Sequence, residues 1–334
     1  MNNPVWEWLI RSRFNAYLAT ERLKGPSALD AGPGWCFDRF GQSSTRLPDG
    51  REVLIAGEHE DHYDPDFYIY NDVVVRHADG RIEIFGYPRD TFPPTDFHSA
   101  TLAGHRIIIV GNLGYLEERQ AGRTPVAVLE LESFRVSKVV TVGVHPGWLH
   151  GHSAVLSEDG ASILIRQGLL DRRDGDGSLV ENIDDWRLRL TDWSWERLTE
   201  RRWQRWEFRR IDRKHNHLWK TRMALCCRDF HQEQGLRQQI EELTKAYGVA
   251  PDLDLAAKLY RPELSHEEVP KVEVEHNVFR IRIDGIVVRY VEEMHAIQMT
   301  VEGNLPQASV QVLESDLLTK LSALENAPYE TKRL

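Results

Sequence analysis

The sequence predicts a mainly β protein: a partial β-propeller of about three blades with an N-terminal helix and a C-terminal α+β region. One strand pattern starts three times, at Gln42, His98 and His152, at intervals of 56 and 54 residues. A repeat of this length indicates stacked or radially arranged units. Each copy continues into further strands, and four strands per roughly 50 residues is typical of a propeller blade.

The three copies share one order of elements. An apolar strand ending in Gly57, Gly111 or Gly168 is followed by a polar loop, at 58–66, 112–124 and 169–182. Two more strands follow each loop, at 69–75 and 81–86, 126–131 and 135–143, and 186–190 and 193–198. Short apolar runs bounded by Gly, Pro and Asp predict strands, and Asp-Gly pairs predict hairpins.

The pattern resembles the kelch repeat over roughly residues 35–200. The copies at His98 and His152 begin with His-Ser-Ala, and an apolar quartet follows in each copy. The later aromatic positions are matched by Tyr70, Trp186 and Trp195. The double glycine of the kelch repeat is reduced to one glycine per copy. The resemblance implies a propeller fold. Kelch-like proteins include binding modules as well as some oxidases and sugar isomerases.

Three blades raise the question of closure, because a propeller usually has about four to eight blades and open sheet edges invite unwanted pairing. Three solutions remain open. The C-terminal strands supply another blade, two chains pair as a homodimer, or a partner protein covers the open array.

The two ends of the chain differ from the repeats. Residues 1–30 contain an amphipathic helix over 4–24, which stops at Gly25-Pro26. Residues 201–265 form a basic, aromatic connector with helices at 233–247 and from 252. Residues 266–334 predict a small α+β domain, with strands at 278–283, 286–291 and 296–301 and a helix over 307–324.

Composition places the chain among globular proteins of the cytoplasm. Apolar residues make up 41% of the 334 residues, which is ample for a core. Three cysteines form no disulfide framework, and we find no signal peptide and no apolar run long enough for a membrane span. The net charge of −10 argues against a nucleic-acid-binding protein.

One segment is basic, although the chain as a whole is acidic. Residues 197–222 hold ten Lys or Arg against three acids and include Trp203, Trp206 and Trp219. Arg with interleaved aromatics suits single-stranded nucleic acid. The preferred interpretation is structural, with Arg stems packed over Trp faces.

The histidines predict neither a metal site nor a cofactor site. His145, His150 and His152 have a spacing that zinc can use. His152 nevertheless occupies the same repeat position as His98, which blade packing explains. The tripeptide at 215–217 matches a nuclease motif in letters only, and the sequence contains no P-loop, nucleophile elbow or dinucleotide fingerprint. We therefore predict no catalytic residues.

The predicted function is a non-catalytic protein–protein interaction module. The loops at 58–66, 112–123 and 169–178 follow equivalent strands, so we expect them to cluster on one face. Their acidic side chains favour a basic protein partner, and neutralisation of a basic toxin is a hypothesis from charge alone. The alternative is an enzyme acting on a carbohydrate or related small molecule. The predicted partner-binding residues are Glu58, Glu60, Asp61, Asp64, Tyr115, Arg119, Asp171, Asp174 and Asp176.

Overall fold

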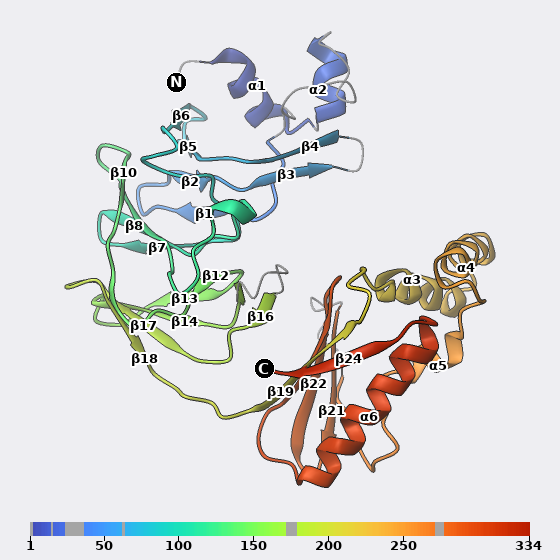
Figure 1. Ribbon diagram of the computed structural model, residues 1–334. Helices are drawn as coiled ribbons and strands as arrows, with labels where there is room; N and C mark the ends of the chain where they lie inside the picture. The colour runs from blue at the N-terminus through green and yellow to red at the C-terminus, as the bar shows by residue number, and fades with distance from the viewer. Residues whose placement is uncertain (1–2, 15, 24–36, 62–63, 172–178, 271–276) are drawn as a thin grey trace. The chain divides into compact units, whose positions relative to one another are not determined.

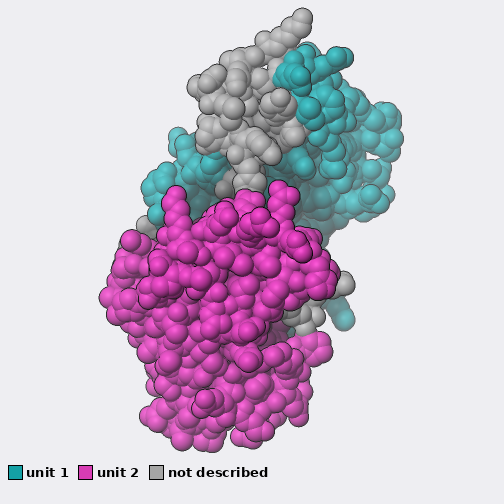
Figure 2. Space-filling view, turned by 90° about the vertical axis from the view of Figure 1, so that its right-hand side faces the viewer, with its two compact units in different colours: residues 1–201 teal, residues 202–334 magenta. Residues whose placement is uncertain are grey.

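The computed structural model describes residues 3–14, 16–23, 37–61, 64–171, 179–270 and 277–334. It divides into two compact units, residues 1–201 and 202–334 (Figure 2). Strands dominate, and helices lie near both ends of the chain (Figure 1). The prediction of a mainly β chain with terminal helices is confirmed.

The first unit contains three sheets of four or five strands, and the four antiparallel strands of each come from one copy of the repeat. The first sheet contains β1 (Ser43–Arg46), β2 (Glu52–Ile55), β5 (Asp72–Arg76) and β6 (Ile82–Gly86). The second contains β7 (Ser99–Ala103), β8 (Arg106–Val110), β9 (Val126–Glu130) and β10 (Arg135–Lys138). The third contains β13 (Ser153–Leu156), β14 (Ser162–Arg166), β17 (Trp186–Arg189) and β18 (Ser194–Arg197), and β11 (Val142–Gly143) pairs parallel with β18. None of the sheets in the described residues closes on itself.

Neighbouring repeats are joined at one recurring position. Gly41, Phe97 and Gly151 precede the three repeat starts, and all have positive φ, at 61°, 47° and 60°. The Phe97 amide donates to the Gly41 carbonyl at 3.0 Å, and the Gly151 amide donates to the Phe97 carbonyl at 2.7 Å. A Cβ on Gly41 would lie 2.5 Å from the Phe97 nitrogen, so glycine permits this close approach.

A side-chain hydrogen bond accompanies each of these junctions. Nε2 of His98 lies 2.8 Å from Oγ of Ser43, and Nε2 of His152 lies 2.8 Å from Oγ of Ser99. The His of one repeat therefore contacts the first-strand Ser of the repeat before it. Ser153 occupies the same position in the third repeat, and its hydroxyl donates to Arg166 within its own sheet. The recurrence of His at 98 and 152 thus has a packing explanation.

Apolar side chains fill the spaces between successive sheets. One cluster, including Ile107 and Leu129, lies between the first and second sheets, and another, including Ile108 and Ile163, lies between the second and third. The far face of the first sheet packs against α1 (Pro4–Ser12) and α2 (Ala16–Leu23). The far face of the third sheet is polar instead.

The predicted single helix over 4–24 is two helices in the structure. Arg13 ends α1 with a φ of 53°, in the left-handed region, which L residues adopt at some cost. Asn3 begins α1 by accepting a hydrogen bond from the Trp6 amide at 3.1 Å. Leu9 and Ile10 are fully buried against the first sheet, as the amphipathic pattern predicts.

Short strands and one 3-10 turn follow the second strands, and one further short strand precedes the third repeat. They are β3 (Glu58–Asp61) with β4 (Asp64–Ile69), η1 (Leu116–Glu118), and β12 (Trp148–His150) with β15 (Leu169–Asp171) and β16 (Leu179–Glu181). Segments predicted as irregular loops in the first and third repeats are therefore partly hairpin ribbons.

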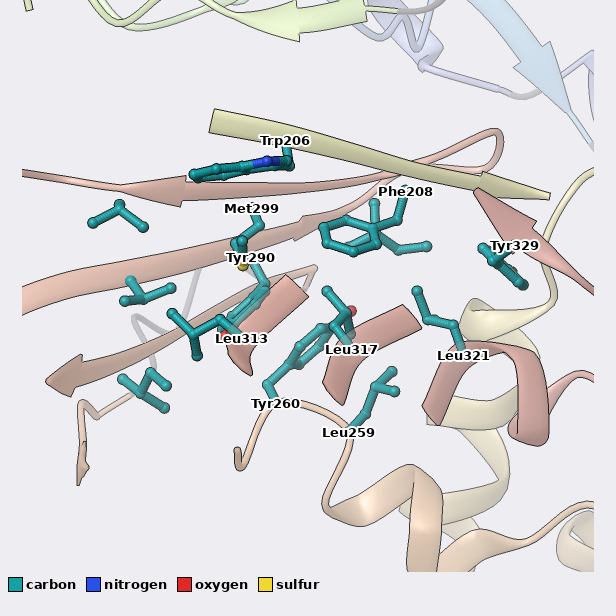
Figure 3. Packing of buried hydrophobic residues seen from close by; sticks show 14 of the residues in the cluster. Trp206, Phe208, Leu259, Tyr260, Tyr290, Met299, Leu313, Leu317, Leu321 and Tyr329 are labelled. Atoms are coloured by element: carbon teal, nitrogen blue, oxygen red, sulfur yellow. The ribbon is translucent and has the colours of Figure 1, made fainter. Parts of the chain in front are cut away.

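The second unit is a six-stranded antiparallel sheet with helices. In order across the sheet, the strands are β20 (Glu267–Glu268), β21 (Val278–Ile283), β22 (Ile286–Glu292), β23 (Ile297–Val301), β19 (Gln204–Arg210) and β24 (Tyr329–Arg333). The helices are α3 (Leu218–Asp229), α4 (Glu233–Tyr247), α5 (Leu253–Ala257) and α6 (Gln307–Leu324). Leu313, Leu317 and Leu321 of α6 pack on Phe208 and Tyr290 of the sheet (Figure 3).

The basic connector is not separate from the α+β region in this structure. Its strand β19 pairs with β23 on one side and β24 on the other. Glu325, 1% exposed, accepts hydrogen bonds from Arg210, the His217 amide and Tyr329, and so links β19 and the start of α3 to the end of α6. No helix in the part of the chain that the structure describes is long and apolar enough to cross a membrane.

Candidate functional site

The extensions that follow the second strands meet one another, as the repeat predicts. Tyr115 follows β8, and its hydroxyl accepts a hydrogen bond from the Ile69 amide of the first ribbon at 3.0 Å. Arg119 pairs with Asp171 of the third ribbon at 3.3 Å and donates to the Gly114 carbonyl at 3.2 Å. The second loop therefore contacts both neighbours, and we call this region the loop face.

Several predicted partner-binding residues lie inside the loop face rather than on its surface. Glu58 and Asp171 are 6% and 4% exposed. Arg119 is largely buried beside Asp171, and Tyr115 is half-buried. In this conformation these groups stabilise the contacts between repeats. The side chains of Glu60, Asp61 and Asp64 and all of Asp174 and Asp176 fall outside the described residues.

The loop face also encloses a pair of carboxyl groups. Asp96, fully buried, accepts a hydrogen bond from the Gly114 amide at 2.6 Å, and its carboxyl is within hydrogen-bonding reach of Glu58. Burial raises the pKa of Asp96, because removal from water penalises the charged form. Neither carboxyl has enough exposed surface to meet a solute.

The His145, His150 and His152 cluster consists of neutral packing groups. Burial lowers the pKa of His150 to about 4, with Arg119 adding to the effect, and burial lowers the pKa of His152 to about 4. Burial also lowers the pKa of His145, and His145 tilts against Trp195. Across the described ranges, no three His, Cys, Asp or Glu side chains are arranged so that they could hold a metal ion.

A cavity of about 580 Å³ opens beside the second sheet. Its floor is apolar, with Ile109, Val126 and Val139, and Trp148 forms a wall. The Trp148 indole donates to the Leu113 carbonyl at 3.0 Å, which fixes that wall to the second loop. The rim is charged, with Arg89, Glu118, Arg119, Arg123 and Lys138. The size falls within the usual range for small-molecule pockets.

Exposed aromatic and aliphatic side chains gather at the edge of the loop face. Phe67, Tyr68 and Leu116 are 45%, 40% and 56% exposed. The Phe67 and Tyr115 rings lie 5.8 Å apart in an edge-on arrangement, and the Arg89 guanidinium lies 5.3 Å from the Tyr115 ring centre. We call Phe67, Tyr68, Tyr115, Leu116 and Arg89 the aromatic patch.

The sequence-based prediction named only Tyr115 of the aromatic patch. The available signal was the pair Phe67-Tyr68 beside Asp64 and Asp66, since aromatic residues in an acidic, polar segment favour an exposed strand. Asp96 was missed as well. It stands two residues before a repeat start, where the other copies have Phe40 and His150.

Comparisons with known proteins add little to this description. No family model and no curated protein matches the chain. Among solved structures, one titled "Structure of YjhT" is similar, with 13% sequence identity and a TM-score of 0.36. The similarity covers 51% of this chain and 54% of that one, so the chain spans about half the length of that protein.

Proposed function

We propose that residues 35–200 are a kelch-like array of three blades that serves as a non-catalytic protein-binding module. The aromatic patch is the observation that carries this proposal. Tyr and Arg dominate binding energy at protein interfaces, and aromatic residues are enriched there. Phe67, Tyr68 and Leu116 expose apolar surface beside Tyr115 and Arg89, which is the composition of an interface centre.

Acidic residues next to the patch in sequence support a basic partner. Glu118 pairs with Arg89 at 2.8 Å, and Glu117 is exposed next to it. Glu60, Asp61 and Asp64 belong to the same ribbon as Phe67 in sequence. Charge of one sign around an interface speeds association with a partner of opposite charge. A basic protein, such as a basic toxin that this chain neutralises, fits these acidic residues.

The buried position of the titratable groups favours binding over catalysis. A general acid or base must reach the proton that it transfers. Asp96 and Glu58 are shielded from solutes, and Arg119 is already paired with Asp171. These groups serve as contacts between repeats, and the exposed aromatic patch provides the binding surface.

The proposal is tested by capture from a native lysate with the tagged full chain. Phe67→Ala combined with Leu116→Ala removes exposed side chains and leaves the buried contacts intact. We expect the captured protein to be lost, because truncation of central interface residues costs about 2 kcal/mol or more each. Val155→Ala, on the exposed face of the third sheet, is the matched control. Equal capture by the double variant and the wild type would reject the aromatic patch.

Removing charged side chains and varying the salt concentration test whether the partner is basic. Glu60→Ala, Asp61→Ala and Asp64→Ala together should slow association and weaken its dependence on salt, with a smaller effect on dissociation. Surface plasmon resonance with the captured partner measures both rates. A triple variant with unchanged association at low salt would contradict a basic partner.

The cavity supports a second candidate function, the binding of a small molecule. An apolar floor with a few charged groups at the rim is the usual form of such a site. The candidate class is a carbohydrate or related compound, with Trp148 at the cavity lining and Arg123 and Lys138 as polar contacts. Thermal shift with a sugar panel tests it, because a ligand at 100 times its Kd stabilises by about 2.7 kcal/mol. Trp148→Leu should abolish any such shift.

A further inference from the structure

The interior of the cavity beside the second sheet offers a ligand mostly apolar surface. Its polar side chains Thr95, Asn112 and Thr124 are 3%, 3% and 2% exposed, and each already donates a hydrogen bond to a backbone carbonyl of the chain itself. Apolar side chains complete this part of the lining: Phe92, Ile109, Val126, Val139 and Trp148. The interior therefore suits an apolar ligand body, since a polar body would lose hydrogen bonds to water there.

Two cationic side chains belong to adjacent strand ends at the rim. Arg123 lies three residues before Val126 of β9, and Lys138 is the last residue of β10. The Val139 amide donates to the Val126 carbonyl at 2.9 Å, so the two strand ends are neighbours. Arg123 donates to the neutral Gln120 side chain at 3.3 Å. Both cations are exposed, and no carboxylate among the described residues forms an ion pair with either of them.

The other charged groups of the rim are paired or lie on different segments. Arg89 pairs with Glu118 at 2.8 Å, and Arg119 is paired within the loop face. Asp90 and Glu117 also line the cavity, and each adjoins the Arg89–Glu118 pair in the sequence. The acids are thus carried by the segments that meet at this pair, and the two unpaired cations by the ends of β9 and β10.

His145 lies close to the basic end and adds no charge to it. Its Nδ1 is 3.4 Å from Oγ1 of Thr141, which lines the cavity. Burial lowers the pKa of His145, and the charge of Arg123 lowers it further. His145 is therefore neutral at pH 7, and the positive charge here comes from Arg123 and Lys138.

We propose that the cavity binds a small organic anion, with an apolar body in the interior and a carboxylate or phosphate group at Arg123 and Lys138. This inference rests on the second candidate function, the binding of a small molecule, and narrows the ligand by charge and polarity. Arg and Lys are the usual partners of carboxylates and phosphates, and their charge-assisted hydrogen bonds are about twice as strong as neutral ones.

Calorimetric titration of the full chain with matched probes tests the charge of the ligand. Indole-3-acetate, tryptophol and tryptamine share one ring system and carry a negative, a neutral and a positive side chain. We expect indole-3-acetate to bind about tenfold more tightly than the other two at low salt, and added salt should reduce this difference. Benzoate and phenyl phosphate, compared on one ring, show which anionic group is preferred, and a preference for either supports the proposal.

Acetate tests the apolar body, because it carries the carboxylate without a ring. It should bind at least about tenfold more weakly than indole-3-acetate, since burial of a ring contributes more than 1.4 kcal/mol, or about a factor of ten. Equal binding of acetate and indole-3-acetate would overturn the assignment of the interior to an apolar body.

Single substitutions at the rim locate the anion. Arg123→Gln and Lys138→Gln should each weaken indole-3-acetate about threefold to tenfold and leave tryptophol unchanged. Glu117→Gln removes a charge of opposite sign from the same rim, and as the matched control it should not weaken indole-3-acetate. All three side chains are exposed, so the thermal unfolding midpoints without ligand should equal that of the wild type.

The outcomes separate this inference from the functions proposed above. Equal affinity for the three indole probes, or a neutral sugar that binds equally to the wild type and Lys138→Gln, would overturn the anion and leave small-molecule binding in place. Absence of binding by every probe and sugar would overturn both. Phe67→Ala with Leu116→Ala should leave indole-3-acetate binding unchanged, so loss of the protein partner and loss of the anion are measured independently.

Discussion

The second and third sheets of the repeat unit have the same order of their four antiparallel strands, but they differ in burial. Both faces of the second sheet are buried, whereas one face of the third is exposed. In the second sheet, Ile107 and Ile108 are both fully buried, although they point to opposite sides. In the third, Ile163 is buried, while Val155 is 63% exposed on the other face, in the same cross-strand row as Arg187. A terminal repeat needs a polar outer face for solubility. The difference indicates that the stack of described sheets ends at the third repeat.

The junctions on either side of the second sheet depend on neutral histidines. Burial lowers the pKa of His98 to about 3 and those of His150 and His152 to about 4. A folded pKa below the unfolded value of about 6.5 gives stability above that pH, which is lost as the pH falls toward 3–4. Asp96 acts in the opposite direction, because its raised pKa favours the folded state at low pH.

The largest expected effect is therefore acid destabilisation of the repeat unit. One unit of pKa difference corresponds to about 1.4 kcal/mol, so three histidines with shifts of about two to three units cost on the order of 10 kcal/mol between pH 7 and pH 4. Urea unfolding across this range measures it. His98→Asn should flatten the pH dependence, whereas His105→Asn, at a site with 81% of its side chain exposed, should not. If the free energy of unfolding depended on pH equally in both variants, the junction histidines would not be the cause of the acid destabilisation.

The sequence predicts the repeats well because their information is local. Strand starts, apolar quartets and Asp-Gly turns lie close together along the chain. In the structure, Asp49, Asp79 and Asp159 each accept a hydrogen bond from the amide two residues ahead. The second-unit meander and α6 were predicted for the same reason. Strands β19 and β24 pair although more than a hundred residues separate them in the chain. No local sequence pattern indicates such a pairing.

The candidate site is predictable only in part. Equivalent strand ends predict that the loops meet, and the contacts of Tyr115 and Arg119 agree. The direction of each side chain is set by partners from other repeats. Thus Glu58 lies inward because Asp96 and the neighbouring loops enclose it, although its loop is polar in sequence.

A lysine substitution in the second sheet and another in the third test the difference in burial between the faces of these two sheets. Val128 is 4% exposed between the second and third sheets. Val128→Lys buries an unpaired charge, and we expect a loss of about 3–5 kcal/mol. Val155→Lys should change stability by about 0.5 kcal/mol or less, because that face is exposed. Thermal unfolding compares the two variants, and equal losses would mean that the outer face of the third sheet is covered.

The serines at the three repeat starts offer a milder comparison. Ser43→Ala and Ser99→Ala each leave a buried histidine without its hydroxyl partner, at a cost of about 1–2 kcal/mol. Ser153→Ala removes a bond within one exposed sheet edge and should cost less than about 0.5 kcal/mol. Chemical denaturation of the three single variants resolves this order. A loss at Ser153 as large as at Ser99 would point to a further repeat contacting it.

The smallest effect is expected at Glu196, which pairs with Arg187 and Arg189 on the outer face of the third sheet. All three side chains are 37–48% exposed, and exposed ion pairs contribute about 0–1 kcal/mol. Glu196→Gln should therefore leave the free energy of unfolding unchanged within about 0.5 kcal/mol, and added salt should mask even that. A loss above 2 kcal/mol would require the pair to be desolvated. In that case the face that ends the stack in the single chain would be an interface, and the array would continue into another molecule.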